Sequence, residues 1–142
     1  MADPVFVDAN IVMDLLAKRV PFHVAAEELF TLSHRGKVKL KVSSLTFSHV
    51  HYILAKQKGR EFSRNKLRQF KVLIEVVGVG DRIIDLALSS SFKDFEDAVQ
   101  YYAAVESNCG VILTRNLKDY KESQIPVMTA ESFMKTWSDG LT

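Results

Sequence analysis

The sequence is poor in the features that mark secreted or thiol-based proteins. Cys109 is the only cysteine among the 142 residues, which excludes an intramolecular disulfide and a site built from several thiolates. The first residues show no basic segment followed by an apolar one, as a signal peptide would. We therefore expect a protein of a reducing compartment and place it in the cytoplasm.

Long apolar runs and nucleotide-binding glycine patterns are missing as well. The longest apolar stretch, residues 72–79, is interrupted by Glu75 and Gly78 and falls well short of the roughly 20 residues that cross a bilayer. The pair Gly78 and Gly80 lacks the third glycine and the lysine of a phosphate-binding loop, and no G-x-S-x-G motif is present. We therefore expect no membrane association. We also find no convincing candidate for a phosphate-binding glycine loop or for a serine nucleophile in a G-x-S-x-G motif.

The composition that is present is that of an ordinary globular protein, with 47% hydrophobic and 25% charged residues. The length suits one domain, which we assign to residues 1–142. Short apolar runs alternate with longer segments whose apolar residues recur at helical spacing. The predicted strands are residues 5–7, 39–42, 73–77, 111–113 and 126–128. This order predicts an α/β fold, with a mostly parallel sheet of four or five short strands covered by helices on both faces.

Polar residues at the predicted helix starts define where the helices begin. Thr46, Asp81, Asp94 and Thr129 each precede a segment of helical spacing and are predicted to start or cap it. Ligands of parallel sheets bind beyond the carboxyl ends of the strands. Polar segments at residues 8–10 and 114–116 follow two predicted strands directly, so they are predicted to face such a crevice.

Charge is unevenly distributed although the net charge is only +2. The stretch 56–71 contains seven lysine and arginine residues and a single acid, Glu61, whereas the acids gather elsewhere. A basic stretch beside an acidic cluster suits a protein that holds a polyanion and acts on it with metal. The alternative, a solvated basic helix, remains open on charge alone.

Three acidic segments carry the candidate chemistry. Asp8 follows the first strand, Asp94, Glu96 and Asp97 open a long helix, and Asp119 lies beyond the fourth strand. Capping, the helix dipole and turn formation are the simpler explanations for each acid taken alone. Three acids within four residues exceed what capping requires, and their mutual repulsion calls for a counter-charge such as a divalent ion.

Taken together, these segments resemble the PIN domain family, and within it the branch of VapC-type toxins. The resemblance covers nearly the whole chain and is carried by four motifs: Val-Phe-Val-Asp-Ala-Asn-Ile at 5–11, Ser-Ser-Leu-Thr at 43–46, Asp-Phe-Glu-Asp-Ala-Val-Gln-Tyr at 94–101 and Leu-Thr-Arg-Asn-Leu-Lys-Asp-Tyr at 113–120. It implies a three-layer α/β/α fold and an endoribonuclease that depends on Mg²⁺ or Mn²⁺.

The resemblance also implies roles for individual residues. Asp8, Asp97 and Asp119 match the acidic metal-binding positions of the family, with Asn116 beside the last. The chain departs from the pattern at His49, where a glutamate is expected. Glu96 is the candidate that compensates for this, and the role of Asp94 stays open. The substrate-binding candidates are Thr114, Arg115, Lys18 and Asn10, with Arg115 and Lys18 expected to bind flanking phosphates.

Three functional hypotheses follow. The first is a metal-dependent endoribonuclease that acts on RNA, as the toxin of a toxin–antitoxin pair, with an antitoxin partner and a homodimeric assembly. The second is a catalytically weak or inactive PIN-like domain that binds RNA or a partner, because an imidazole is a poorer ligand than a carboxylate for a hard ion. The third is a structural α/β domain whose acids only cap helices and form turns.

Overall fold

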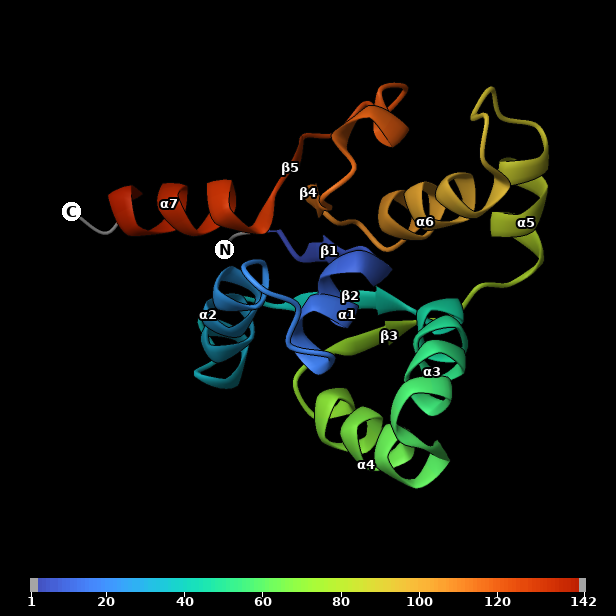
Figure 1. Cartoon of the computed structure of the whole chain (residues 1–142). Coiled ribbons are helices and arrows are strands. Elements are labelled where there is room, and N and C mark those ends of the chain that lie inside the picture. Colours follow the sequence, from blue (N-terminus) through green and yellow to red (C-terminus); the bar gives the residue numbers. More distant parts are fainter. Residues whose placement is uncertain (1–2, 141–142) are drawn as a thin grey trace.

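The sheet at the centre of the molecule is entirely parallel. The computed structural model describes residues 3–140, with side chains to residue 137. Within that range five strands pair in the order β3-β2-β1-β4-β5 (Figure 1). Their bounds are β1 Val5–Val7, β2 Leu40–Ser43, β3 Glu75–Val77, β4 Val111–Leu113 and β5 Val127–Met128. The predicted sheet is thus confirmed, with every pair parallel rather than most of them.

Helices cover both faces of this sheet. Their bounds are α1 Ala9–Leu16, α2 His23–His34, α3 Ser44–Lys58, α4 Arg60–Lys71, α5 Asp81–Leu88, α6 Phe95–Glu106 and α7 Ala130–Gly140, with a 3₁₀ turn η1 at Leu117–Tyr120. One apolar core joins the sheet to α1, α2, α3, α4 and α7, and a second joins it to α5 and α6 (Figure 1). The arrangement is the expected three-layer α/β/α fold.

The central strand β1 shows how the sequence produces these layers. Val5 and Val7 belong to the first core and Phe6 to the second, because successive side chains of a strand point to opposite faces. All three are buried, as expected for a strand covered on both sides.

The strand order places a switch point between β1 and β4. From β1 the chain builds outward through β2 to β3, and then returns to add β4 and β5 on the other side of β1. The connections leave these two strands in opposite directions, which opens a crevice at their carboxyl ends. The Asp8 amide donates to the Leu113 carbonyl across this point at 3.0 Å, so the segments that follow both strands meet there.

Helix starts agree with the sequence predictions at two positions and differ at two. Asp94 caps α6, accepting the Asp97 amide at 3.0 Å, and the Thr129 hydroxyl accepts the Ser132 amide at 3.1 Å at the start of α7. The cap predicted at Thr46 is wrong. The cap of α3 is Ser43, whose hydroxyl accepts the Leu45 amide at 3.1 Å.

The second difference concerns α5. Asp81 is its first residue rather than its cap, and Gly80 occupies the cap position without a side-chain hydrogen bond.

In the part of the chain that the structure describes, no helix combines the length and the apolar character needed to cross a bilayer.

Candidate functional site

Asp8 is the most firmly held acid of the crevice. It lies at the carboxyl end of β1, caps α1 and is buried. Its Oδ1 accepts the Ala9 amide at 2.7 Å and Gln100 Nε2 at 3.2 Å, and its Oδ2 accepts the Thr114 hydroxyl at 2.8 Å and Asn10 Nδ2 at 3.4 Å. Burial raises the pKa of Asp8, while the bonds from Thr114, Ala9 and Gln100 oppose that rise. The carboxylate is therefore fixed in one orientation before any ligand binds.

Gln100 is a site residue that the sequence analysis missed. It lies on α6, is buried, and donates from Nε2 to Asp8 and also to Thr46 Oγ1 at 3.2 Å. Its Oε1 is buried and has no hydrogen-bond partner among the described residues. A glutamine on the buried face of a helix otherwise lined by Val99 and Ala103 was the signal that could have identified it.

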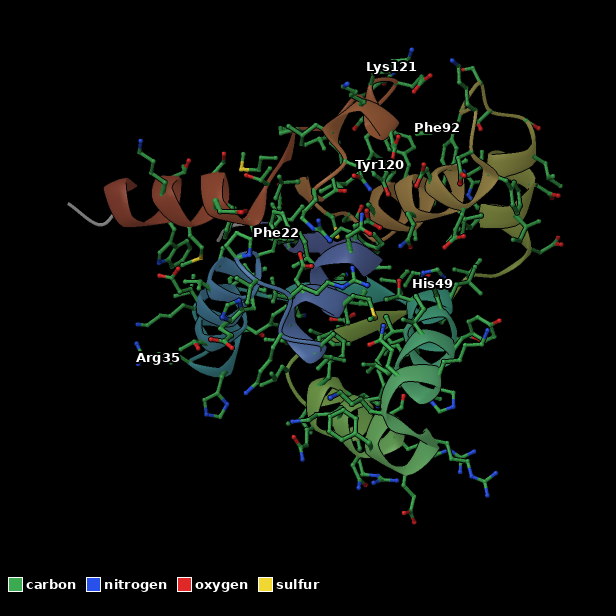
Figure 2. The ribbon with its side chains drawn as sticks, viewed as in Figure 1. Phe22, Arg35, His49, Phe92, Tyr120 and Lys121 are labelled. Atoms are coloured by element: carbon green, nitrogen blue, oxygen red, sulfur yellow. The ribbon has the colours of Figure 1, made fainter. Side chains whose placement is uncertain are left out.

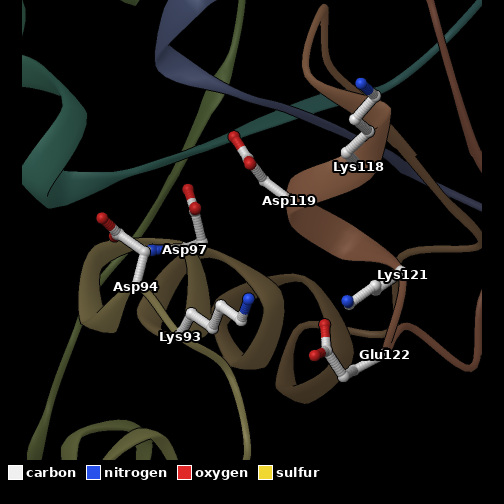
Figure 3. A pocket seen from close by; sticks show the side chains of 7 residues that line it. All are labelled: Lys93, Asp94, Asp97, Lys118, Asp119, Lys121 and Glu122. Carbon is white, nitrogen blue, oxygen red and sulfur yellow. The ribbon is translucent and has the colours of Figure 1, made fainter.

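A second group of acids lies at the start of α6 and in η1. Asp97 and Asp119, from segments that are distant in sequence, line one hollow of about 230 Å³ together with Asp94 (Figure 3). The pKa of Asp97 is raised to about 7, first by burial and then by repulsion from Asp94, Asp119, Asp8 and Glu96. Five carboxylates therefore share one region at the carboxyl ends of β1 and β4.

His49 borders this acidic cluster. It lies at the end of α3 nearest α6 (Figure 2), and its Nδ1 is 3.7 Å from Glu96 Oε1. Both side chains are about half exposed, at 46% for His49 and 60% for Glu96. The position where a glutamate was expected therefore faces the cluster rather than the core.

Thr114 and Asn116 lie at the end of β4, where they were predicted. Thr114 is buried, and its hydroxyl both donates to Asp8 and accepts the Asn116 amide at 3.0 Å. Asn116 is exposed and precedes η1 directly, so it lies close to the acids without any side-chain bond to them among the described residues.

The two basic residues predicted to bind phosphate do not gather at the acids. Arg115 Nε is 2.9 Å from Oδ2 of the buried Asp14, and the guanidinium lies 4.0 Å from the centroid of the Phe22 ring. Burial raises the pKa of Asp14, and the adjacent Arg115 opposes that rise. Arg115 thus has a structural partner, and its exposed fraction of 27% leaves part of the guanidinium open to solvent.

The structure places Lys18 apart from the acidic cluster. It follows the carboxyl-terminal end of α1 and lines a different hollow, of about 330 Å³, with Leu16, Leu54, Lys58 and Lys66. α1 begins beside Asp8 and runs away from it, so a residue beyond its far end lies away from the crevice.

The residues of the crevice suit a hard divalent cation in their chemistry. Carboxylate and amide oxygens predominate, which is the ligand type that Mg²⁺ and Mn²⁺ take, and the mutual repulsion of the acids would be relieved by a cation. Gln100, which bonds Asp8 through Nε2, has no partner for Oε1, and the hydroxyl of the buried Tyr120 (Figure 2) also lacks a partner among the described residues. Over the described residues, no three His, Cys, Asp or Glu side chains are yet arranged as metal ligands, so binding would require the exposed acids to turn toward Asp8.

Comparison with known proteins agrees with this geometry. A family model described as PIN domain matches residues 4–118. The ribonuclease VapC1 of Aquifex aeolicus (strain VF5) is 27% identical over 142 residues, which cover 96% of this chain and 97% of that protein.

Two solved structures share the fold. VapBC2 from Rickettsia felis, bound to a DNA fragment from its promoter, matches with a TM-score of 0.67 at 17% identity, over 87% of this chain and 96% of that one. Mycobacterium tuberculosis VapC20, a toxin that cleaves the sarcin–ricin loop, matches with a TM-score of 0.61 at 15% identity, over 76% and 86%. The resemblance carried by the sequence motifs is confirmed, and the chain belongs to the PIN domain family.

Proposed function

We propose that this PIN domain is a divalent-metal-dependent endoribonuclease and the toxin of a toxin–antitoxin pair. The observation that carries the proposal is the convergence of acids from β1, α6 and η1 at the switch point of the sheet. The names of its relatives support the reaction class, because one is a ribonuclease and another a toxin that cleaves the sarcin–ricin loop.

Asp8, Asp97 and Asp119 would hold Mg²⁺ or Mn²⁺, with Glu96 as a further oxygen donor. When bound, such an ion supplies positive charge to a phosphodiester and makes water more acidic. Asp8 contributes a carboxylate that is already oriented by four donors. Gln100 keeps that orientation from the α6 side, and Thr114 does so from the β4 side.

Asp97 gives the site a group that changes protonation near neutral pH. In the absence of a cation its raised pKa, about 7, keeps a proton on a large share of the molecules. Binding of a divalent cation would release that proton, because positive charge favours the ionised carboxylate. Asn116 and Asn10 would donate hydrogen bonds to an RNA phosphate at the edge of the crevice.

The cleavage test uses end-labelled single-stranded RNA in Mg²⁺, in Mn²⁺ and in EDTA. We expect cleavage by the wild type only with metal, and loss of at least about 100-fold in rate for Asp119→Asn, since a ligand and a charge are removed together. The matched control is Asp85→Asn, an exposed acid of α5 outside the cluster. Equal activity in EDTA, or equal rates for the two variants, would refute the proposal.

We also propose that the chain acts as a homodimeric single domain in the cytoplasm and is neutralised by an antitoxin. The support for the antitoxin is that one structural neighbour is described as a toxin–antitoxin complex, whereas the dimer and the location rest on the family resemblance. Sedimentation of the pure protein tests the dimer. Co-expression with the product of the adjacent gene tests the antitoxin, which should form a stable complex and suppress RNA cleavage.

A further inference from the structure

The hollow beside the carboxylates is lined by cations as well as acids. Lys93 precedes the cap of α6, Lys118 lies in η1, and Lys121 follows it directly. Lys93 and Lys121 extend from opposite walls of the hollow (Figure 3). We call these three residues the lysine rim; none of them was singled out by the sequence analysis, because they come from two segments that are distant in the sequence.

Glu122 lines this hollow together with the lysine rim and the acids of the cluster, but no ion pair ties a rim lysine to any of these carboxylates among the described residues. All three lysine side chains are exposed. Their ammonium groups thus remain free for an anionic ligand. A ligand that approaches the acids through a bridging cation, and also carries further negative charges, would meet cations on this side of the crevice.

The lysines of the basic stretch 56–71 that line a hollow do not lie beside the acidic cluster. Lys58 and Lys66 line the hollow that also contains Lys18, over an apolar floor of Leu54 and Phe62. Lys58 is the last residue of α3 and lies nine residues beyond His49, or about 13 Å along the helix axis. The end of α3 that carries Lys58, and the whole of α4, which carries Lys66, lie away from α6 (Figure 1).

We propose that the lysine rim is the subsite that binds the RNA phosphates flanking the cleaved bond, and that the basic stretch is not part of the RNA path. The inference rests on the proposed ribonuclease function and adds the direction in which the substrate leaves the acids, across η1 and the loop before α6. Lysines suit this task because they bind phosphate as point charges without reading sequence.

The test compares two triple variants that lose the same charge. Lys93→Ala/Lys118→Ala/Lys121→Ala removes the rim, and Lys18→Ala/Lys58→Ala/Lys66→Ala removes the lysines of the other hollow. Binding of fluorescein-labelled single-stranded RNA is followed by anisotropy in EDTA over a salt series, and circular dichroism checks that both variants fold. KM and kcat of cleavage are then measured in Mg²⁺.

Each single-strand phosphate contact contributes about −0.7 to the slope of log K against log salt, so loss of the rim should make the slope shallower by about 2. Near 0.1 M salt this corresponds to roughly a 100-fold loss of affinity. The same variant should show a raised KM with little change in kcat, because the rim binds phosphates that do not react. The control variant should bind within about threefold of the wild type, since its lysines line a separate hollow that contains none of the acids of the cluster.

The possible results separate the inference from the proposed function. Wild-type affinity and KM in the rim variant, or equal losses in both triple variants, overturn the lysine-rim subsite while leaving the nuclease intact. A loss of RNA affinity confined to the control variant would place the RNA along the basic stretch and would also overturn the lysine-rim subsite. If the wild type neither binds nor cleaves RNA, the proposed function fails and the inference fails with it.

Discussion

Asp97→Asn should stabilise the metal-free protein at neutral pH although it removes a proposed metal ligand. The pKa of Asp97 is raised from 3.8 to about 7 by burial and by the surrounding acids. Because the folded state holds the proton more tightly than the unfolded state, the stability of the wild type should fall as pH rises from about 4 to about 7. Below pH 4 the carboxyl is protonated in both states and contributes no such loss.

The size of the effect follows from that difference. The rise in the pKa of Asp97 from 3.8 to about 7 corresponds to a loss of at most about 4 kcal/mol in the free energy of unfolding at pH 8. Asp97 is partly open to solvent, which screens its repulsion, so we expect about 1–2 kcal/mol. For a chain of this length that is about 3–8 °C in Tm.

Thermal and urea unfolding in EDTA at pH 5 and pH 8 measure this difference. The wild type should be less stable at pH 8 than Asp97→Asn, and the gap should narrow at pH 5. Mn²⁺ should raise the Tm of the wild type and leave that of the variant nearly unchanged, since ligand binding stabilises only a state that binds it. Asp85→Asn, an exposed acid outside the cluster, is the matched control. Parallel pH profiles for the wild type and Asp97→Asn would refute the repulsion argument.

Three further variants test single contacts. His49→Glu should increase Mg²⁺ affinity in calorimetric titration, because it adds a carboxylate where Nδ1 now lies 3.7 Å from Glu96; unchanged affinity would mean that this position is no ligand. Gln100→Leu should lower kcat by about 10- to 100-fold with little change in Tm, since Asp8 loses an orienting donor, and an unaltered kcat would contradict that role. Arg115→Ala should cost about 2–3 kcal/mol in urea unfolding because it leaves the buried Asp14 unpaired, whereas a raised KM at unchanged stability would assign Arg115 to RNA instead.

The sequence was sufficient to place the first acid of the site. A short apolar strand followed by Asp8 predicts a side chain at the carboxyl end of a buried parallel strand, and the structure has it there. Local order of this kind depends on periodicity and on the neighbouring residues, both of which are visible in a sequence.

The cap of α3 was predicted at the wrong residue because several neighbouring residues could serve as the cap. Ser43, Ser44 and Thr46 all have a hydroxyl that can cap a helix, and propensity does not distinguish among them. Tertiary contacts decide instead: Thr46 lies inside the helix and accepts a bond from Gln100 on α6.

Long basic side chains were the least predictable part of the site. Each lysine of the rim directly precedes an acid in the sequence, whereas Lys18 lies between Ala17 and Arg19, but only the topology of the sheet decides which hollow each of them lines. Gln100 was missed because its partners, Asp8 and Thr46, lie 92 and 54 residues away along the chain.

The central claim is that the converging acids hold a divalent cation for cutting RNA. Its most direct test is the single-turnover rate of RNA cleavage as a function of Mn²⁺ concentration, measured for the wild type and Asp8→Asn. We predict a rate that rises with Mn²⁺ and saturates for the wild type, and for Asp8→Asn a rate that stays at the metal-free background at every concentration. Equal metal-dependent cleavage by both proteins would contradict the account.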